Sequence, residues 1–170
     1  AEYLILGQHF LKPEHPDGVH SFFPTDDATK LTAYADSLVA AIKTGAFTYI
    51  AHPDVFRFTG EERLFTEAMR RVCVASREHG VPFIVNDNVD VALAMGADGI
   101  HVGQEDMEAS KVRERVGSDM MIGVSVHSVE EALEAVKNGA DCLGVGAMFS
   151  TSTKTDVNVM PKETLRDICA

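Results

Sequence analysis

Short apolar runs alternate along the chain with longer amphipathic stretches. The amphipathic stretches carry apolar residues at the spacing of one helix face, and the set Leu31, Tyr34, Leu38 and Ile42 is the clearest case. The apolar runs have the length of buried strands. They lie at residues 3–10, 47–52, 82–85, 99–102, 121–126 and 142–148. Regular alternation of strand and helix predicts a parallel sheet with right-handed crossovers and helices outside it.

A three-residue repeat marks two of the predicted connections. Gly96-Ala97-Asp98 precedes the run at 99–102, and Gly139-Ala140-Asp141 precedes the run at 142–148. The two copies predict the same helix-to-strand connection at both places. Between them, Ser128 and Glu131 form a capping box, which predicts the start of a helix.

Polar residues lie at or just past the end of every predicted strand. They are Gln8-His9, His52-Pro53-Asp54, Asn86-Asp87, Gly103 to Asp106, Ser125 to His127 and Ser150 to Lys154. An open parallel sheet concentrates its site at one switch point, whereas a barrel uses all of its strand ends. We therefore predict an α/β fold in one domain, residues 1–170, with a partial TIM-barrel-like (βα)6 sheet and helices outside. Six strands are too few to close such a barrel, so we expect open edges that favour a homo-oligomer.

Composition narrows the class of protein. An apolar fraction of 45% is typical of a soluble globular domain. The 15 basic and 26 acidic residues give a net charge of −11, which excludes nucleic acid as an expected partner. No apolar run approaches the roughly 20 residues of a membrane helix, and no signal peptide is visible. Three unpatterned cysteines indicate free thiols, and together these features predict a cytoplasmic protein.

Two aspartates stand just past neighbouring strand ends. Asp87 and Asp106 could together hold Mg²⁺ bridging a pyrophosphate, because carboxylate oxygens are ligands that this ion prefers. They could equally cap the helices that follow them. Spacing does not choose between these interpretations.

Two further groups carry candidate chemistry. The hydroxyls and ammonium of residues 150–154 suit a phosphate, although polar linkers have the same composition. His9 and His52 end two strands and could ligate Zn²⁺, Mn²⁺ or Fe, but two ligands do not complete a site. We favour a scaffolding role for both histidines, and a structural role for His101 and His127.

From about Pro82 onward the sequence resembles thiamine-phosphate synthase, the TenI-like family. The matching motifs are IVNDNVDVALAMGADGIHVGQED, IGVSVHSVEEALEAVKNGAD and LGVGAMFSTSTKTD. The resemblance implies a TIM barrel that joins a pyrimidine pyrophosphate to a thiazole phosphate, with Mg²⁺ assisting departure of pyrophosphate. It implies that Asn86 contacts the pyrimidine-pyrophosphate substrate and that Ser125 lies near the reacting carbon as the catalytic residue. It further implies Mg²⁺ at Asp87 and Asp106, and a phosphorylated small metabolite bound by Thr151, Thr153 and Lys154.

Residues 1 to about 81 instead resemble the second half of PHP-family histidinol phosphatases. The matching stretches are EYLILGQHF and FTYIAHPDVF. In that family the histidines that match His9 and His52 belong to a multinuclear metal site. The opening H-x-H and closing D-x-H motifs of the family are missing, so Zn²⁺ or Mn²⁺ binding is not favoured.

The two resemblances together predict a chimera of two truncated barrels. The chain lacks an initiator methionine and ends before the next expected strand, which we interpret as the sign of a fragment. Because part of the substrate envelope is missing, we expect little or no native catalysis, and whether the chain is an enzyme stays open. The alternatives are a metal-dependent phosphoesterase and a non-catalytic phosphate-binding scaffold.

Overall fold

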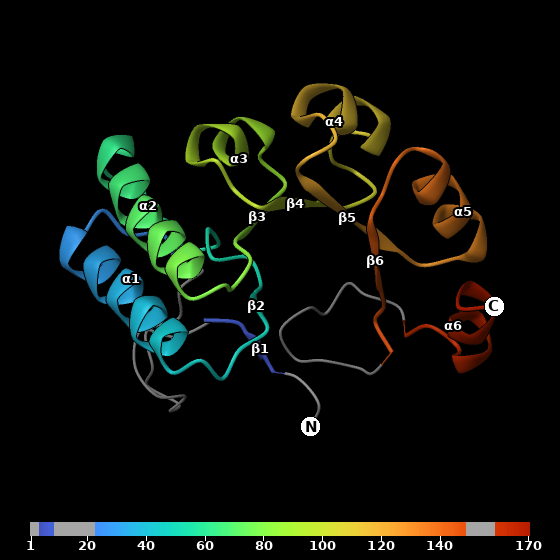
Figure 1. The fold of residues 1–170 in the computed structure, drawn as a ribbon, viewed down its shortest axis with the longest axis horizontal. Coiled ribbons are helices and arrows are strands. Elements are labelled where there is room, and N and C mark those ends of the chain that lie inside the picture. The colour runs from blue at the N-terminus through green and yellow to red at the C-terminus, as the bar shows by residue number, and fades with distance from the viewer. Residues whose placement is uncertain (1–3, 9–22, 149–158) are drawn as a thin grey trace. The chain divides into compact units, whose positions relative to one another are not determined.

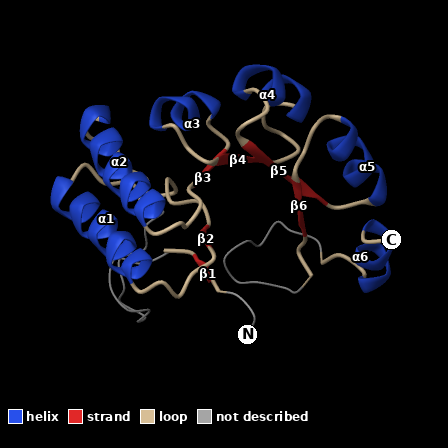
Figure 2. Cartoon of the chain, viewed as in Figure 1, coloured by secondary structure: helices blue, strands red, loops and turns tan. Residues whose placement is uncertain are grey.

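The computed structural model describes residues 4–8, 23–148 and 159–170. Strands and helices alternate through this part of the chain (Figures 1 and 2), and parallel pairs form between the first two strands and between the last two. The elements are β1 (Ile5–Leu6), α1 (Ala28–Lys43), β2 (Tyr49–Ile50), α2 (Glu62–Glu78), β3 (Ile84–Asn86), α3 (Val89–Met95), β4 (Gly99–Val102), α4 (Ala109–Val116), β5 (Met121–Val126), α5 (Val129–Lys137), β6 (Cys142–Val145) and α6 (Lys162–Ile168).

Backbone contacts divide the chain into two compact units, Ala1–Gly99 and Ile100–Ala170. This boundary lies well past residue 81, where the two sequence resemblances meet. None of the helices in the described residues is long and apolar enough to cross a membrane.

The first unit is built on short parallel strands. Ile5 and Leu6 of β1 pair with Tyr49 and Ile50 of β2, and Ile50 forms a parallel bridge to Phe83, just before β3. The side chains of Ile50, Phe83 and Val85 are fully buried, so the core of this unit lies along these strands.

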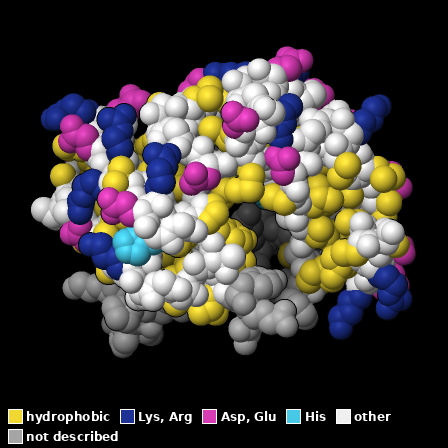
Figure 3. All heavy atoms as spheres, in the orientation of Figure 1, with side chains coloured by type: hydrophobic (Ala, Val, Ile, Leu, Met, Phe, Trp, Pro, Cys, Tyr) yellow, Lys and Arg dark blue, Asp and Glu magenta, His cyan; other side chains and the backbone are white. Residues whose placement is uncertain are grey.

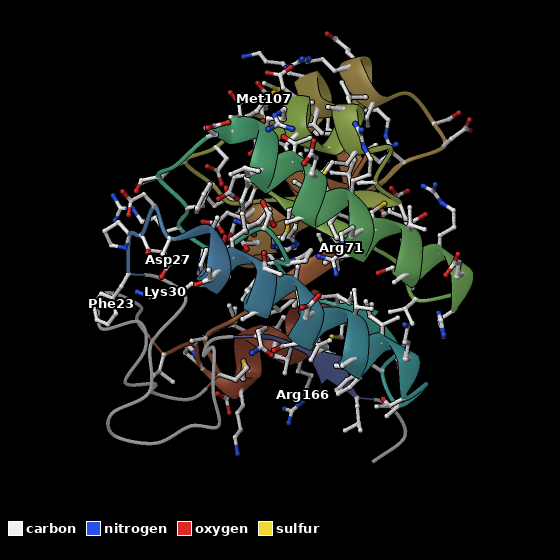
Figure 4. All side chains as sticks on the ribbon, turned by 90° about the vertical axis from the view of Figure 1, so that its left-hand side faces the viewer. Phe23, Asp27, Lys30, Arg71, Met107 and Arg166 are labelled. Carbon is white, nitrogen blue, oxygen red and sulfur yellow. The ribbon has the colours of Figure 1, made fainter. Side chains whose placement is uncertain are left out.

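Two long helices, α1 and α2, pack side by side in the first unit (Figure 1). The predicted apolar face of α1 is confirmed, because Leu31, Tyr34, Leu38 and Ile42 are all buried. Asp27 caps the helix by accepting the backbone N–H of Thr29 at 2.9 Å. On the surface, Arg71 of α2 forms an ion pair with Asp36 of α1, and Figure 4 shows Arg71 beside α1.

The second unit pairs β5 with β6 in parallel, with Gly123 opposite Cys142 and Val126 opposite Val145. Helices α4 and α5 pack against β5 and lie outside the strands (Figure 2). Ala132 and Ala135 are the buried residues of α5. The larger apolar residues of this helix, Leu133 and Val136, are 68% and 59% exposed. Figure 3 shows hydrophobic side chains on the surface in the region of α5.

The predicted Gly-Ala-Asp connection is confirmed in both copies. Gly96 and Gly139 take positive φ angles of 61° and 94°, which end the preceding helices. The carboxylate of Asp98 then accepts the N–H of Phe83 at 2.9 Å, and that of Asp141 accepts the N–H of Ile122 at 2.8 Å. In each copy the aspartate therefore ties the connection to the beginning of the strand before it.

Candidate active site

The end of β3 carries the first predicted site residues, and a carboxylate from the turn after β2 holds it. The N–H of Asn86 donates to Asp54, with its nitrogen 3.1 Å from Oδ1 and 3.3 Å from Oδ2. Burial raises the pKa of the Asp54 carboxyl to about 6, while the Asn86 N–H acts to lower it. Burial also raises the pKa of the Tyr34 hydroxyl, and the negative charge of Asp54 raises this pKa further.

Asp87 follows in a strained backbone conformation. Its φ is +60°, and among the non-glycine residues of the described chain only His52, at +39°, also has a positive φ. Asp87 is exposed, and its neighbour Asn88 caps α3 by accepting the N–H of Val91 at 3.1 Å. Asn88, rather than Asp87, is therefore the N-cap of α3.

Asp106 lies in the second unit, in the turn after β4. Its Oδ2 accepts the N–H of Gly103 at 2.7 Å, and the side chain is exposed. The N-cap of α4 is Glu108 and that of α3 is Asn88, so neither Asp106 nor Asp87 occupies the N-cap position of the helix that follows it. Asp106 instead closes its own turn.

Asp87 and Asp106 each carry the kind of ligand that Mg²⁺ takes. This ion commonly takes one or two protein carboxylates and completes its octahedron with water and substrate phosphates. Asp87 and Asp106 are both exposed carboxylates that follow strand ends. They belong to different units, so their sharing of one ion stays a prediction.

Ser125 of β5 has a histidine partner. The Nε2 of His101, in β4, lies 2.8 Å from the Ser125 Oγ, and both side chains are partly buried. The side-chain amide of Gln104 donates to the Ser125 carbonyl at 2.6 Å. These contacts fix both the backbone and the hydroxyl of the predicted catalytic residue.

The His101 ring fits where two glycines leave room. A Cβ on Gly123 would lie 2.5 Å from Nδ1 of His101, and a Cβ on Gly144 would lie 2.9 Å from its Cε1. The ring therefore extends from β4 over β5 toward β6. Sequence analysis assigned His101 a structural role and missed this pairing with Ser125. The signal was present, because glycines on two strands after a histidine-bearing strand indicate a bulky side chain lying across them.

A cavity of about 210 Å³ adjoins the β4 exit in the second unit. Gln104 and Asp106 line it, together with Glu108, Glu131 and Glu134. These carboxylates would repel an isolated phosphate. They favour a cation, or a phosphate that has a cation bound to it.

Four predicted ligands lie outside the described residues: His9, Thr151, Thr153 and Lys154. Their roles stay predictions. His52 is described and lies in the turn after β2. Within residues 4–8, 23–148 and 159–170, no group of three or more His, Cys, Asp or Glu side chains could hold a metal ion. The proposed transition-metal pair thus gains no support here.

The fold places the chain in the TIM-barrel-like class, as predicted. Thiamine phosphate pyrophosphorylase from Pyrococcus furiosus is similar, with a TM-score of 0.64 and 39% identity, covering 79% of this chain and 62% of that one. The chain belongs to the thiamine monophosphate synthase family, whose model matches residues 23–170.

Curated relatives have the same family name. Thiamine-phosphate synthase from Ruminiclostridium cellulolyticum is 51% identical over 110 residues, which cover 65% of this chain and 52% of the relative. The synthase from Clostridium perfringens strain 13 is 58% identical over 91 residues, 54% of this chain and 44% of the relative. The chain spans about half the length of the curated relatives it matches.

The family match also bears on the first 81 residues. Because it begins at residue 23, it includes most of the segment that sequence analysis compared with PHP phosphatases. The PHP resemblance, and the chimera inferred from it, gain no support from these matches. The relation to thiamine-phosphate synthase therefore extends over most of the chain.

Proposed function

We propose that this chain catalyses thiamine-phosphate synthase chemistry, joining a pyrimidine pyrophosphate to a thiazole phosphate. The observation that carries the proposal is the held Ser125 hydroxyl, 2.8 Å from His101, within motifs that resemble the synthase family. Relatives named for this activity are more than half identical over the matched residues. In the reaction, the bond from the reacting carbon to pyrophosphate breaks and a bond to the thiazole forms.

Each candidate residue has one role in this proposal. Asn86 binds the pyrimidine pyrophosphate, and Thr151, Thr153 and Lys154 bind phosphate. Asp87 and Asp106 hold Mg²⁺, which when bound neutralises negative charge on the departing pyrophosphate. The turn that positions Asp106 is closed by its own bond to Gly103, so this carboxylate is preorganised before any ligand arrives.

The His101–Ser125 pair can direct a proton. If Nε2 carries the imidazole proton, His101 donates to the Ser125 Oγ and leaves the hydroxyl proton directed elsewhere. We assign that proton to an oxygen of the departing pyrophosphate, whose charge grows as the bond to carbon breaks. Gln104 keeps the strand backbone in place by its bond to the Ser125 carbonyl.

The test is thiamine phosphate formation by the purified chain from the two substrates, with and without Mg²⁺. Asp106→Asn keeps an oxygen that can accept the Gly103 N–H but removes the charge, so the turn is retained while the metal ligand is weakened. We expect its turnover to fall by about 100-fold or more. Glu105→Gln is the matched control, since it removes an exposed carboxylate one residue away. Its turnover should stay within about twofold of the parent chain.

Two results would contradict the proposal. If the parent chain forms no thiamine phosphate at any Mg²⁺ concentration, the interpretation as a non-catalytic scaffold replaces it. If Glu105→Gln and Asp106→Asn reduce turnover equally, the loss comes from the overall negative charge of the loop and not from a metal ligand at Asp106.

A further inference from the structure

The exits of β2 and β3 in the first unit share an unusual backbone feature. His52 follows β2 and Asp87 follows β3, and these are the two non-glycine residues with positive φ in the described chain. Such conformations persist only where surrounding contacts impose them, and they gather at functional turns.

One contact that joins the two exits is the hydrogen bond from Asn86 to Asp54. Asp54 lies two residues past His52, and Asn86 immediately precedes Asp87. Both carboxylate oxygens of Asp54 lie within 3.3 Å of the same backbone nitrogen. Hydrogen bonds to an ionised acceptor are stronger than neutral ones, and this one is partly buried.

The surroundings of Asp54 make this bond hard to replace. Burial raises the pKa of its carboxyl, and the fully buried Tyr34 ring stacks on Phe56 at a centroid distance of 4.9 Å nearby. The Tyr34 hydroxyl lies close enough for the Asp54 charge to raise its pKa, yet it has no hydrogen-bond partner among the described residues. The carboxylate is thus directed at the strand end rather than at the neighbouring phenol.

We propose that Asp54 is a positioning residue, which fixes the β3 exit so that Asn86 and Asp87 present their side chains to the pyrophosphate substrate and its Mg²⁺. This inference rests on the proposed function, because it assigns Asp54 a part in that same site. Asp54 itself touches neither substrate nor metal. Its effect passes through the backbone of Asn86 to the strained turn at Asp87.

A matched control exists at the other end of the same strand. Asp98 accepts the N–H of Phe83, just before β3, at 2.9 Å. Asp54→Ala and Asp98→Ala therefore each remove one carboxylate acceptor from the backbone of the same strand region. Loss of stability is expected in both variants, but only Asp54→Ala loosens the exit.

The measurement is calorimetric binding of Mg²⁺ with inorganic pyrophosphate, paired with kcat and KM for thiamine phosphate formation. We expect Asp54→Ala to weaken pyrophosphate binding about tenfold and to lower kcat, while Asp98→Ala stays within about twofold of the parent chain. Asp54→Asn keeps an acceptor oxygen, so it should restore binding to within about threefold. If Asp54→Ala does not fold, Asp54→Val, whose branched apolar side chain leaves less empty space and cannot accept a hydrogen bond, takes its place.

The outcomes separate the two proposals. Equal binding by the Asp54→Ala and Asp98→Ala variants, in a parent chain that is active, overturns the role of Asp54 alone. Failure of Asp54→Asn to restore binding also overturns it. A parent chain that neither binds Mg²⁺ with pyrophosphate nor forms product overturns the proposed function, and the positioning role with it.

Discussion

The two Gly-Ala-Asp connections have the same backbone design but differ in the arginine that supports each. At the first, Arg77 donates one bond, to the carbonyl of Gly96 at 2.7 Å. At the second, Arg113 donates to the carbonyl of Gly139 at 2.8 Å and also pairs with the Asp141 carboxylate. The same arginine further bonds the carbonyls of Gly117 and Met120, at 2.7 and 2.8 Å.

The comparison distinguishes the contribution of the repeated glycine and aspartate from the contribution of the neighbouring arginine. Glycine and aspartate set the path of the chain in both copies, through a positive φ and a bond to the preceding strand. Arg113 adds a junction between the end of α4, the start of β5 and the end of α5, which Arg77 does not make among the described residues. The second unit should therefore depend far more on its arginine than the first.

Replacing the arginines gives the largest expected effect. Arg113→Met leaves two partly buried carbonyls, one exposed carbonyl and one carboxylate without their donor, and we expect it to lower the free energy of unfolding by about 2–4 kcal/mol. Arg77→Met removes one exposed bond and should cost about 0.5–1 kcal/mol. Urea unfolding of both variants checks this. Equal losses would mean that the extra bonds of Arg113 contribute nothing net.

Adding a methyl group to each glycine tests the shared part of the design. Gly139→Ala should cost about 2 kcal/mol, because a φ of 94° lies outside the left-handed well and the new Cβ meets Arg113 Cγ at 3.4 Å. Gly96→Ala should cost about 1 kcal/mol, since its φ is 61° and its nearest neighbour, Arg77, is 3.9 Å away. Thermal unfolding of the two variants ranks them. A larger loss at Gly96 would contradict the comparison.

Acid should weaken the second connection slightly. The Ile122 N–H, and after it the Arg113 guanidinium, hold the pKa of Asp141 below its usual range. A carboxyl with a lowered folded-state pKa stabilises the protein above its unfolded pKa near 3.9, and that stability is lost as pH falls through the folded value. The side chain is 48% exposed, so we expect less than about 1 kcal/mol.

Unfolding in urea between pH 6 and 2 measures this loss in the parent chain and in Asp141→Asn. The variant should show a smaller acid-dependent decline, because its side chain does not titrate. In an Arg113→Met background the difference should shrink further. An undiminished acid effect in Asp141→Asn would assign the titration to another group.

Much of the fold could be predicted from periodicity, and the reasons for the errors are physical. The strands at 99–102 and 121–126 have the predicted bounds, because buried parallel strands are continuous apolar runs with sharp ends. The first strand was predicted over 3–10, but β1 spans Ile5–Leu6 within the described residues. In α5 the small residues Ala132 and Ala135 are buried, because small residues allow a helix to lie close to its sheet, while Leu133 and Val136 are exposed.

The candidate site was predictable in its motif residues but not in their partners. The motif residues lie at or after strand ends, which can be predicted from the sequence alone. They are Asn86, Asp87, Asp106 and Ser125. The bond from Asn86 to Asp54 joins residues 32 positions apart, and that from Ser125 to His101 joins residues 24 apart. Such pairs depend on the register between strands, which apolar patterning does not encode when both faces of the strands are covered.

The glycines beneath His101 have a consequence for how this region can change over evolution. A side chain at either Gly123 or Gly144 would displace the imidazole, and the Ser125 hydroxyl would then lose its partner without any change in Ser125 itself. The four positions can therefore vary only as a group. Related sequences that acquire a bulkier residue at Gly123 should carry a smaller one in place of the histidine, and should supply the hydroxyl with a partner from elsewhere.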